Sequence, residues 1–145
     1  MVTCTTPPFR AAVRLNSGVS ALKIVSAIRS FFDQSNRGWW TAFSVNQTED
    51  GFTVIESGRK ARSCEVAWND IQSVCFVDGG QGSDCFYVHT TNNRDPVMVP
   101  TEAVGGLAFW DTLKQRGLFP PEISGQAVRS TNQGSQLWWP PKTER

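Results

Sequence analysis

WNDIQSVCFVDGGQGSDCFYVHTTNNRDPVMVPTEAVGGLAFW, residues 68–110, is the stretch of this chain that decides its fold. Its short runs rich in Val, Phe and Tyr are separated by clusters of Gly, Asn and Asp, which is the pattern of strands joined by turns. The expected strands span residues 71–77, 84–90 and 97–99. After Pro100, the apolar side chains of Leu107, Trp110 and Leu113 recur at helical spacing. We therefore expect one amphipathic helix that turns this ridge toward the strands and closes them.

The residues on either side extend the pattern. Apolar runs bounded by turn residues predict three earlier strands, over residues 39–45, 52–55 and 62–67. The polar segment 124–135 offers few core anchors, and LWWPP at 137–141 either ends the ordered chain or returns as an added edge strand. The predicted fold class is α+β: a bent antiparallel sheet, or partly open barrel, of about six to seven strands closed by one C-terminal helix.

Length and charge limit the classes of protein to consider. A chain of 145 residues with 39% hydrophobic content supports one domain with a substantial core. Residues 1–40 hold five basic groups and one acidic group, whereas the remainder holds nine basic and twelve acidic groups. The mildly acidic remainder of the chain is poorly suited to binding the phosphate backbone of a nucleic acid, so no nucleic-acid partner is expected. The expected division is an arm and helix over 1–38, the sheet domain over 39–116, and a segment over 117–145 that can pack back on the sheet.

The first 32 residues contain no Asp or Glu and carry spaced Arg and Lys, a composition that overlaps with organelle transit peptides. The favoured alternative is an additional N-terminal surface helix, capped at Asn16 or Ser17 and ending near Gly38. Its apolar stripe would be Leu22, Val25, Ile28 and Phe32. The run 19–32 is too short and too charged to span a bilayer, and no secretory signal is visible. We therefore expect a cytoplasmic protein with no integral membrane association.

The cysteines allow two interpretations. Cys4, Cys64, Cys75 and Cys85 include no C-x-x-C pair, which favours reduced thiols buried as small apolar residues, with no metal or cofactor. On one strand, Cys85 and His89 would lie about 13 Å apart, so one ion could not take both. The alternative is a metal-binding or small-ligand-binding protein that uses Cys64, Cys75, Cys85 and His89.

Catalysis is not expected, because no set of residues supplies a nucleophile, a base and an orienting group together. The single histidine, His89, lies in an expected strand. Asp70 and Asp84 could be imagined as paired carboxylates, but each follows the pattern of a residue that caps a corner or a strand start. We therefore expect that the protein is not an enzyme.

Six tryptophans are the strongest indication of a binding role, and four of them form two doublets. Neighbouring side chains on a strand face opposite sides, so each doublet should turn one ring inward and one outward. Exposed tryptophan is a frequent hot-spot residue at protein interfaces, although an outward ring can also pack under a terminal segment. The candidate partner-binding residues are Trp39, Trp40, Trp138 and Trp139.

Several short motifs carry a resemblance to a family. They are W-N-D-I-Q-S-V, D-C-F-Y-V, V-M-V-P-T-E-A-V-G-G, a helix and a late L-W-W. Together they resemble a group of small uncharacterised bacterial proteins with a pleckstrin-homology-like fold. The resemblance covers roughly residues 51–139 and implies strands plus one C-terminal helix, with no established activity. The basic N-terminal region and the Trp-Trp-Pro-Pro ending depart from that group.

The same resemblance raises the question of lipid binding, since pleckstrin-homology domains hold inositol phosphates with basic residues in and beside the first hairpin loop. Here that loop, 46–51, carries Glu49 and Asp50, which would repel an anionic head group. A basic cluster, Arg59, Lys60 and Arg62, follows one turn later. Anionic lipid binding through this cluster is the third interpretation, behind a metal or small-ligand site. The favoured function is a non-catalytic protein-binding module, immunity-like or regulatory, that occludes another protein.

Overall fold

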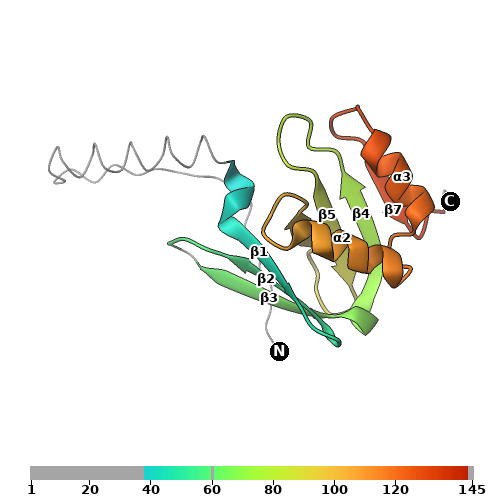
Figure 1. Ribbon diagram of the computed structural model, residues 1–145. Coiled ribbons are helices and arrows are strands. Elements are labelled where there is room, and N and C mark those ends of the chain that lie inside the picture. Colours follow the sequence, from blue (N-terminus) through green and yellow to red (C-terminus); the bar gives the residue numbers. More distant parts are fainter. Residues whose placement is uncertain (1–37, 60, 144–145) are drawn as a thin grey trace, which may run out of the picture.

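The computed structural model describes residues 38–59 and 61–143. In chain order, the described elements are η1 (Trp39–Ala42), β1 (Phe43–Gln47), β2 (Gly51–Glu56), β3 (Arg62–Ala67), η2 (Trp68–Asp70), β4 (Ile71–Val77), β5 (Cys85–Thr90), β6 (Val97–Pro100), α2 (Gly106–Gln115), α3 (Pro121–Arg129) and β7 (Gln136–Trp139). Figure 1 shows two antiparallel sheets with α2 lying across them and α3 beside β7. The α+β class is therefore confirmed, but the strands form two sheets rather than one bent sheet. The helix expected before Gly38 lies outside the described residues.

The three-stranded sheet has the order β1-β2-β3. Its first turn is tight: the Thr48 backbone N–H donates to the Gly51 carbonyl at 2.8 Å, and the Thr48 hydroxyl accepts from the Gly51 N–H at 3.2 Å. A Cβ at Gly51 would collide with the carbonyl oxygen of Val66 on the neighbouring strand. Glycine at this position therefore permits the close approach of β2 to β3.

The four-stranded sheet has the order β6-β5-β4-β7. Its last strand comes from the C-terminal segment and pairs antiparallel with β4, where Val74 lies opposite Trp139 and Val77 opposite Gln136. Of the two outcomes predicted for LWWPP, the added edge strand is the one that forms. β4 thereby becomes an inner strand, which satisfies backbone groups on both of its sides.

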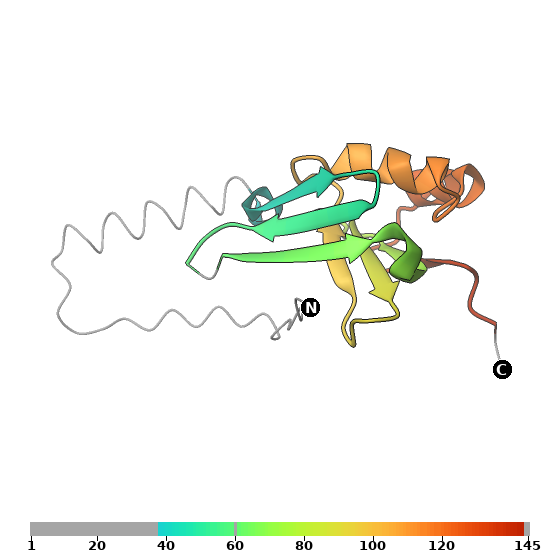
Figure 2. The same cartoon turned by 90° about the horizontal axis from the view of Figure 1, so that it is seen from below.

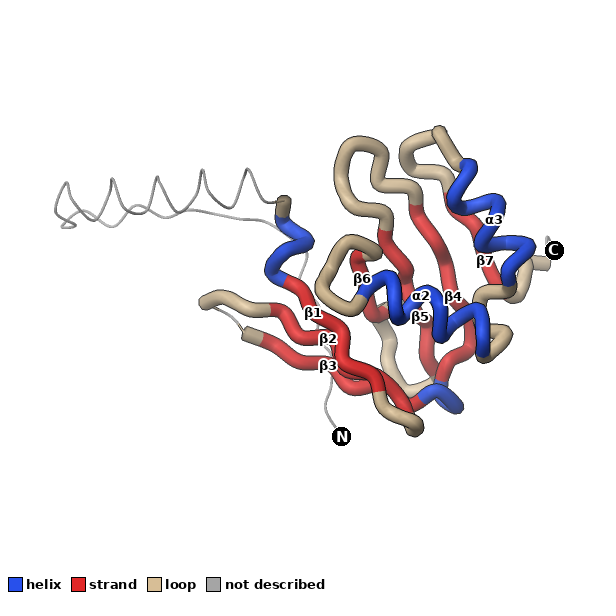
Figure 3. The backbone as a smooth tube through the Cα atoms, in the orientation of Figure 1, coloured by secondary structure: helices blue, strands red, loops and turns tan. Residues whose placement is uncertain are grey.

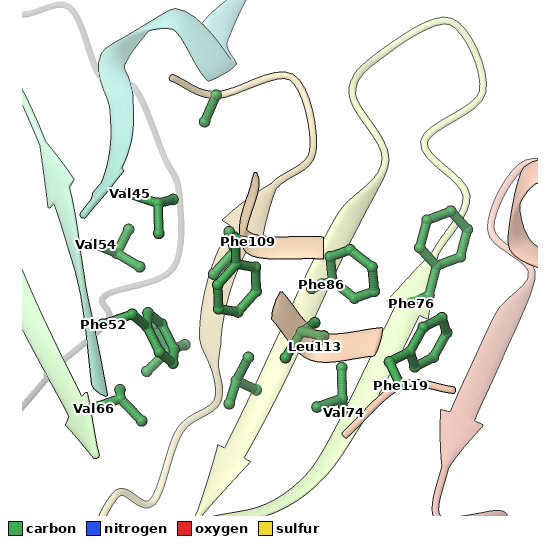
Figure 4. Close-up of a cluster of buried hydrophobic side chains, with 14 of the residues drawn as sticks. Val45, Phe52, Val54, Val66, Val74, Phe76, Phe86, Phe109, Leu113 and Phe119 are labelled. Atoms are coloured by element: carbon green, nitrogen blue, oxygen red, sulfur yellow. The ribbon is translucent and has the colours of Figure 1, made fainter. Parts of the chain in front are cut away.

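The core lies between the two sheets, and α2 fills it (Figures 3 and 4). The Phe109 ring lies 4.7 Å from that of Phe52 on β2 and 6.2 Å from that of Phe86 on β5, measured between centroids, so one side chain bridges the sheets. Leu113, one turn later, is fully buried. An i, i+4 pair of this kind projects from one side of a helix into the core.

The predicted ridge of α2 is correct at two of its three positions. Leu113 is buried and Trp110 is partly buried against the core, but Leu107 is 67% exposed. At 3.6 residues per turn, Leu107 lies roughly 160° around the helix axis from Phe109, so both cannot face the core. The helix begins at Gly106, after Gly105 with a φ of 81°, and Phe109 occupies the place expected for Leu107.

The expectation of one C-terminal helix and a weakly anchored segment after it is wrong. α3 follows α2, and its Ser124 and Ala127 are buried. The indole N–H of Trp110 donates to the Ser124 hydroxyl at 3.0 Å, and that hydroxyl donates to the Phe119 carbonyl at 3.2 Å. α2 ends at Gln115, just before Gly117 with a φ of 69°, and Pro121 occupies the first turn of α3, a position that suits proline. Small residues at the contact leave little apolar periodicity in the sequence.

The first predicted strand also begins later than expected. Residues 39–42 form the 3-10 helix η1, and the strand starts at Phe43. Both the backbone N–H and the hydroxyl of Thr41 donate to the Gly38 carbonyl, at 3.3 and 2.9 Å. This local bonding draws the chain away from an extended conformation. The other predicted strands agree with the structure to within one or two residues at each end.

Candidate protein-binding surface

Trp39 is the most exposed of the four candidate tryptophans, at 41%. Its ring makes edge-to-face contacts with Trp40, at a centroid distance of 6.1 Å, and with Phe43, at 5.8 Å. Phe43 is itself part of the buried core. Trp39 is thus an exposed ring that is held in place by a second aromatic residue and by the core.

Two further exposed apolar residues belong to the loop before α2 and to the first turn of that helix. Val104 is 74% exposed, and its carbonyl accepts the Val45 backbone N–H at 2.8 Å, so the loop before α2 is tied to β1. Leu107 follows in the first turn of α2. Figures 1 and 2 show η1 and this loop side by side. We call Trp39, Val104 and Leu107 the Trp39 surface.

Sequence reasoning missed two of these three residues. Leu107 was expected in the core, and Val104 was not singled out. The relevant signal is Gly105-Gly106, since a Cβ at Gly105 would collide with the Val45 carbonyl oxygen and one at Gly106 with the Thr101 carbonyl oxygen. The glycine pair therefore lets the loop lie directly on β1 and turns Val104 outward.

The doublet Trp138-Trp139 lies on β7, in a different part of the fold, and it divides as predicted for a strand. Trp139 packs against the core. The Trp138 ring instead lies 5.1 Å from that of His89, between centroids, with the Lys142 amine 3.7 Å from its own centroid. The cation and the imidazole cover much of this ring, so it offers a partner less free surface than Trp39 does. Trp40 is partly buried and serves mainly to support Trp39.

The candidate metal ligands do not gather at one point. Cys64 lies on β3 in the three-stranded sheet and is disulfide-bonded, so the expectation of reduced thiols is wrong at this residue. Cys75, Cys85 and His89 lie in the four-stranded sheet. Burial raises the pKa of Cys75 to about 11 and that of Cys85 to about 12, and burial lowers the pKa of His89. Within the described residues there is no group of three or more His, Cys, Asp or Glu that could hold a metal ion.

The basic cluster is only partly described. Arg59 is exposed and Lys60 lies outside the described residues. Arg62 forms an ion pair with Glu56, with its Nη2 atom 2.8 Å from the Glu56 Oε2 atom. Because this carboxylate compensates one of the charges, the cluster is a weaker attraction for an anionic head group than its sequence indicates.

The acidic residues considered for catalysis hold turns. Asp70 Oδ2 accepts from the Asn92 amide at 2.9 Å, and Asp84 Oδ1 accepts from the Gly79 backbone N–H at 2.8 Å. Buried Asp78 accepts from the Gly80 N–H and from the Ser130 hydroxyl, each at 2.8 Å. The bond between Ser130 and Asp78 ties the β4–β5 loop to the loop before β7, whereas Asp84 closes the β4–β5 loop and Asp70 joins η2 to the turn after β5. All three carboxylates therefore have a structural use.

Comparisons with known proteins add no family. No protein-family model, no curated protein and no solved structure matches this chain. Among the described residues, no helix is both long enough and apolar enough to cross a membrane.

Proposed function

We propose that this protein is a non-catalytic protein-binding module that engages its partner through the Trp39 surface. The observation that carries the proposal is a tryptophan 41% exposed to solvent yet fixed by two edge-to-face ring contacts. A ring fixed before binding loses little conformational entropy on association, which is why exposed aromatic anchors dominate many interfaces.

The surroundings of Trp39 support this use. Val104 and Leu107 are 74% and 67% exposed and are presented by a loop bonded to β1 and by the first turn of α2. Exposed apolar side chains that cluster on rigid elements are typical of an interface core. A partner of matching chemistry presents an apolar groove or pocket that receives the indole ring. In the concrete form of the proposal, binding occludes that groove, as in an immunity or regulatory protein.

Copurification from the native host, with mass spectrometry of the bound proteins, tests the proposal. Trp39→Ala and Leu107→Glu should each reduce recovery of the same identified partner by about tenfold or more, as expected for loss of an interface anchor. Leu107→Glu should keep a melting temperature close to that of the wild type, because Leu107 is largely exposed. Trp39→Ala removes two ring contacts at a side chain that is 41% exposed, so it should lower the melting temperature modestly and still give a folded protein.

Val128→Glu is the matched control, since Val128 is 73% exposed but lies on α3, away from the Trp39 surface. It should leave partner recovery unchanged. Equal loss of the partner in all three variants, or unchanged recovery in Trp39→Ala and Leu107→Glu, would refute the proposal.

We propose further that the chain is related to the bacterial pleckstrin-homology-like proteins that its motifs resemble, and that it works in the cytoplasm. Two antiparallel sheets with α2 across them support the first part. For the second part, the free thiols of Cys75 and Cys85 agree with a reducing compartment, whereas the disulfide at Cys64 argues against one.

A further inference from the structure

The indole N–H of Trp39 has no hydrogen-bond acceptor in the described part of the chain, and the side chain is 41% exposed. Other indoles are satisfied within the fold. Trp68 donates to the Thr48 carbonyl at 3.1 Å, and Trp110 donates to the Ser124 hydroxyl at 3.0 Å. An indole nitrogen can only donate, so a partner that covers Trp39 must supply an acceptor or leave a buried donor unsatisfied.

A space lies beside this edge of the ring. A Cβ built on Gly82 would lie 3.9 Å from the Trp39 Nε1 atom and 3.4 Å from the Gly79 carbonyl oxygen. Apart from its chain neighbours, no other described atom would come within 4 Å of it. Gly82 has no positive φ, so the backbone itself does not require glycine here. We call this space, bounded by Trp39, Gly79 and Gly82, the Gly82 notch.

The loop that forms the notch is held by several hydrogen bonds. The Gly82 N–H donates to the Gly79 carbonyl at 3.0 Å, and the Gly79 N–H donates to Asp84 Oδ1 at 2.8 Å. The Ser83 hydroxyl accepts the Glu102 backbone N–H at 3.3 Å, which ties this loop to the one before α2. A notch fixed in this way is ready to receive a group without further ordering of the loop.

The charges near the notch favour an uncharged acceptor. Asp84 and Glu102 are the acidic residues of this bonded network, and neither forms an ion pair with a basic residue that the structure describes. A carboxylate from the partner would therefore meet like charge. We propose that the partner places an uncharged carbonyl oxygen in the Gly82 notch, where it accepts the Trp39 indole N–H. The assignment rests on the function proposed above and adds to it one acceptor at the edge of the apolar groove.

The unbound protein provides the first test. In the full chain labelled with nitrogen-15, the Trp39 indole signal is assigned by its loss in Trp39→Phe. Its N–H should exchange with water faster than those of Trp68 and Trp110 by about tenfold or more, because those two have acceptors in the fold. Equal protection of all three would mean that the Trp39 N–H already has an acceptor, which would overturn the proposal.

Binding of the copurified partner provides the second test, with the dissociation constant as the measurement. Replacement of Trp39 by 3-benzothienylalanine substitutes sulfur for the N–H and keeps the shape of the ring. It should weaken binding by about tenfold or more, as expected for an acceptor buried without its donor. Gly82→Val fills the notch and should weaken binding similarly, and Gly82→Ala replaces it if the valine variant does not fold.

Two matched controls accompany these variants. The same sulfur replacement at Trp40, which is partly buried, should leave the dissociation constant unchanged. So should Gly125→Val on α3, where a Cβ would meet only the Arg129 guanidinium, at 3.6 Å. Glu102→Gln should change the dissociation constant by no more than about twofold. A gain in affinity of about tenfold would instead identify a carboxylate of the partner and overturn the uncharged acceptor.

The comparison with Trp39→Ala separates this proposal from the function on which it rests. If Trp39→Ala loses the partner while the sulfur replacement at Trp39 and Gly82→Val bind as the wild type does, the Trp39 surface stands and the acceptor in the notch is refuted. If binding survives Trp39→Ala, or if no partner is recovered, both are refuted.

Discussion

The thiols of Cys75 and Cys85 lie in the interior of the four-stranded sheet, and burial raises the pKa of both. In the unfolded chain, thiols titrate near 9.0, whereas in the folded protein Cys75 keeps its proton to about pH 11 and Cys85 to about pH 12. Above pH 9 the unfolded state therefore binds fewer protons than the folded state, and the free energy of unfolding falls as pH rises. Tyr87, whose pKa burial also raises, acts in the same direction.

A double variant, Cys75→Ala with Cys85→Ala, checks this linkage. It loses packing at every pH, so the informative quantity is the change in free energy of unfolding between pH 8 and pH 10, measured with urea. That change should be smaller in the variant than in the wild type, because the two titrating groups are gone. An identical change in both proteins would show that these thiols are not the source of the alkaline loss.

At the scale of single elements, α2 owes its place to Phe109. Phe109→Ala should lower the free energy of unfolding by about 3–5 kcal/mol, since it removes a fully buried ring that contacts both sheets. Leu107→Ala, on the exposed side of the same helix, should change it by no more than about 0.5 kcal/mol. Urea denaturation measures both, and Phe109→Leu provides a milder change if the alanine variant does not fold. Similar costs for Phe109→Ala and Leu107→Ala would mean that the helix presents a different side to the core.

The elements predicted well from the sequence are those with turn residues at both ends. β3 and β4 are bounded by Gly58, by the corner at Trp68–Asp70 and by Gly79-Gly80, and their predicted ranges agree with the structure. η1 and α3 were not predicted, because they form through particular hydrogen bonds that the order of apolar and polar residues does not reveal. Thr41 bonds back to the Gly38 carbonyl, and Ser124 bonds the Trp110 indole. The same limit applies to the candidate surface: Trp39 could be named from composition, but the exposure of Val104 and Leu107 follows from how a glycine pair lies on β1.

For the molecule as a whole, the final strand is expected to be indispensable. Removal of residues 136–145 deletes β7, uncovers one edge of β4 and takes Leu137 and Trp139 away from the core. An open apolar edge favours pairing between molecules, so this shortened chain should unfold or aggregate. Removal of residues 142–145 alone keeps β7 and should give a monodisperse protein with a cooperative melt. Size-exclusion chromatography and thermal unfolding distinguish the two, and a stable, monodisperse chain ending at 135 would show that β7 is dispensable.

The position of β7 also bears on how the protein is made. Because its partner β4 is synthesised some sixty residues earlier, that hydrogen-bonded ladder cannot close until residues 136–139 have left the ribosome. Until then, β4 has an unpaired edge that is open to chaperones or to neighbouring nascent chains. The four-stranded sheet is thus completed by a strand that is made well after the other three.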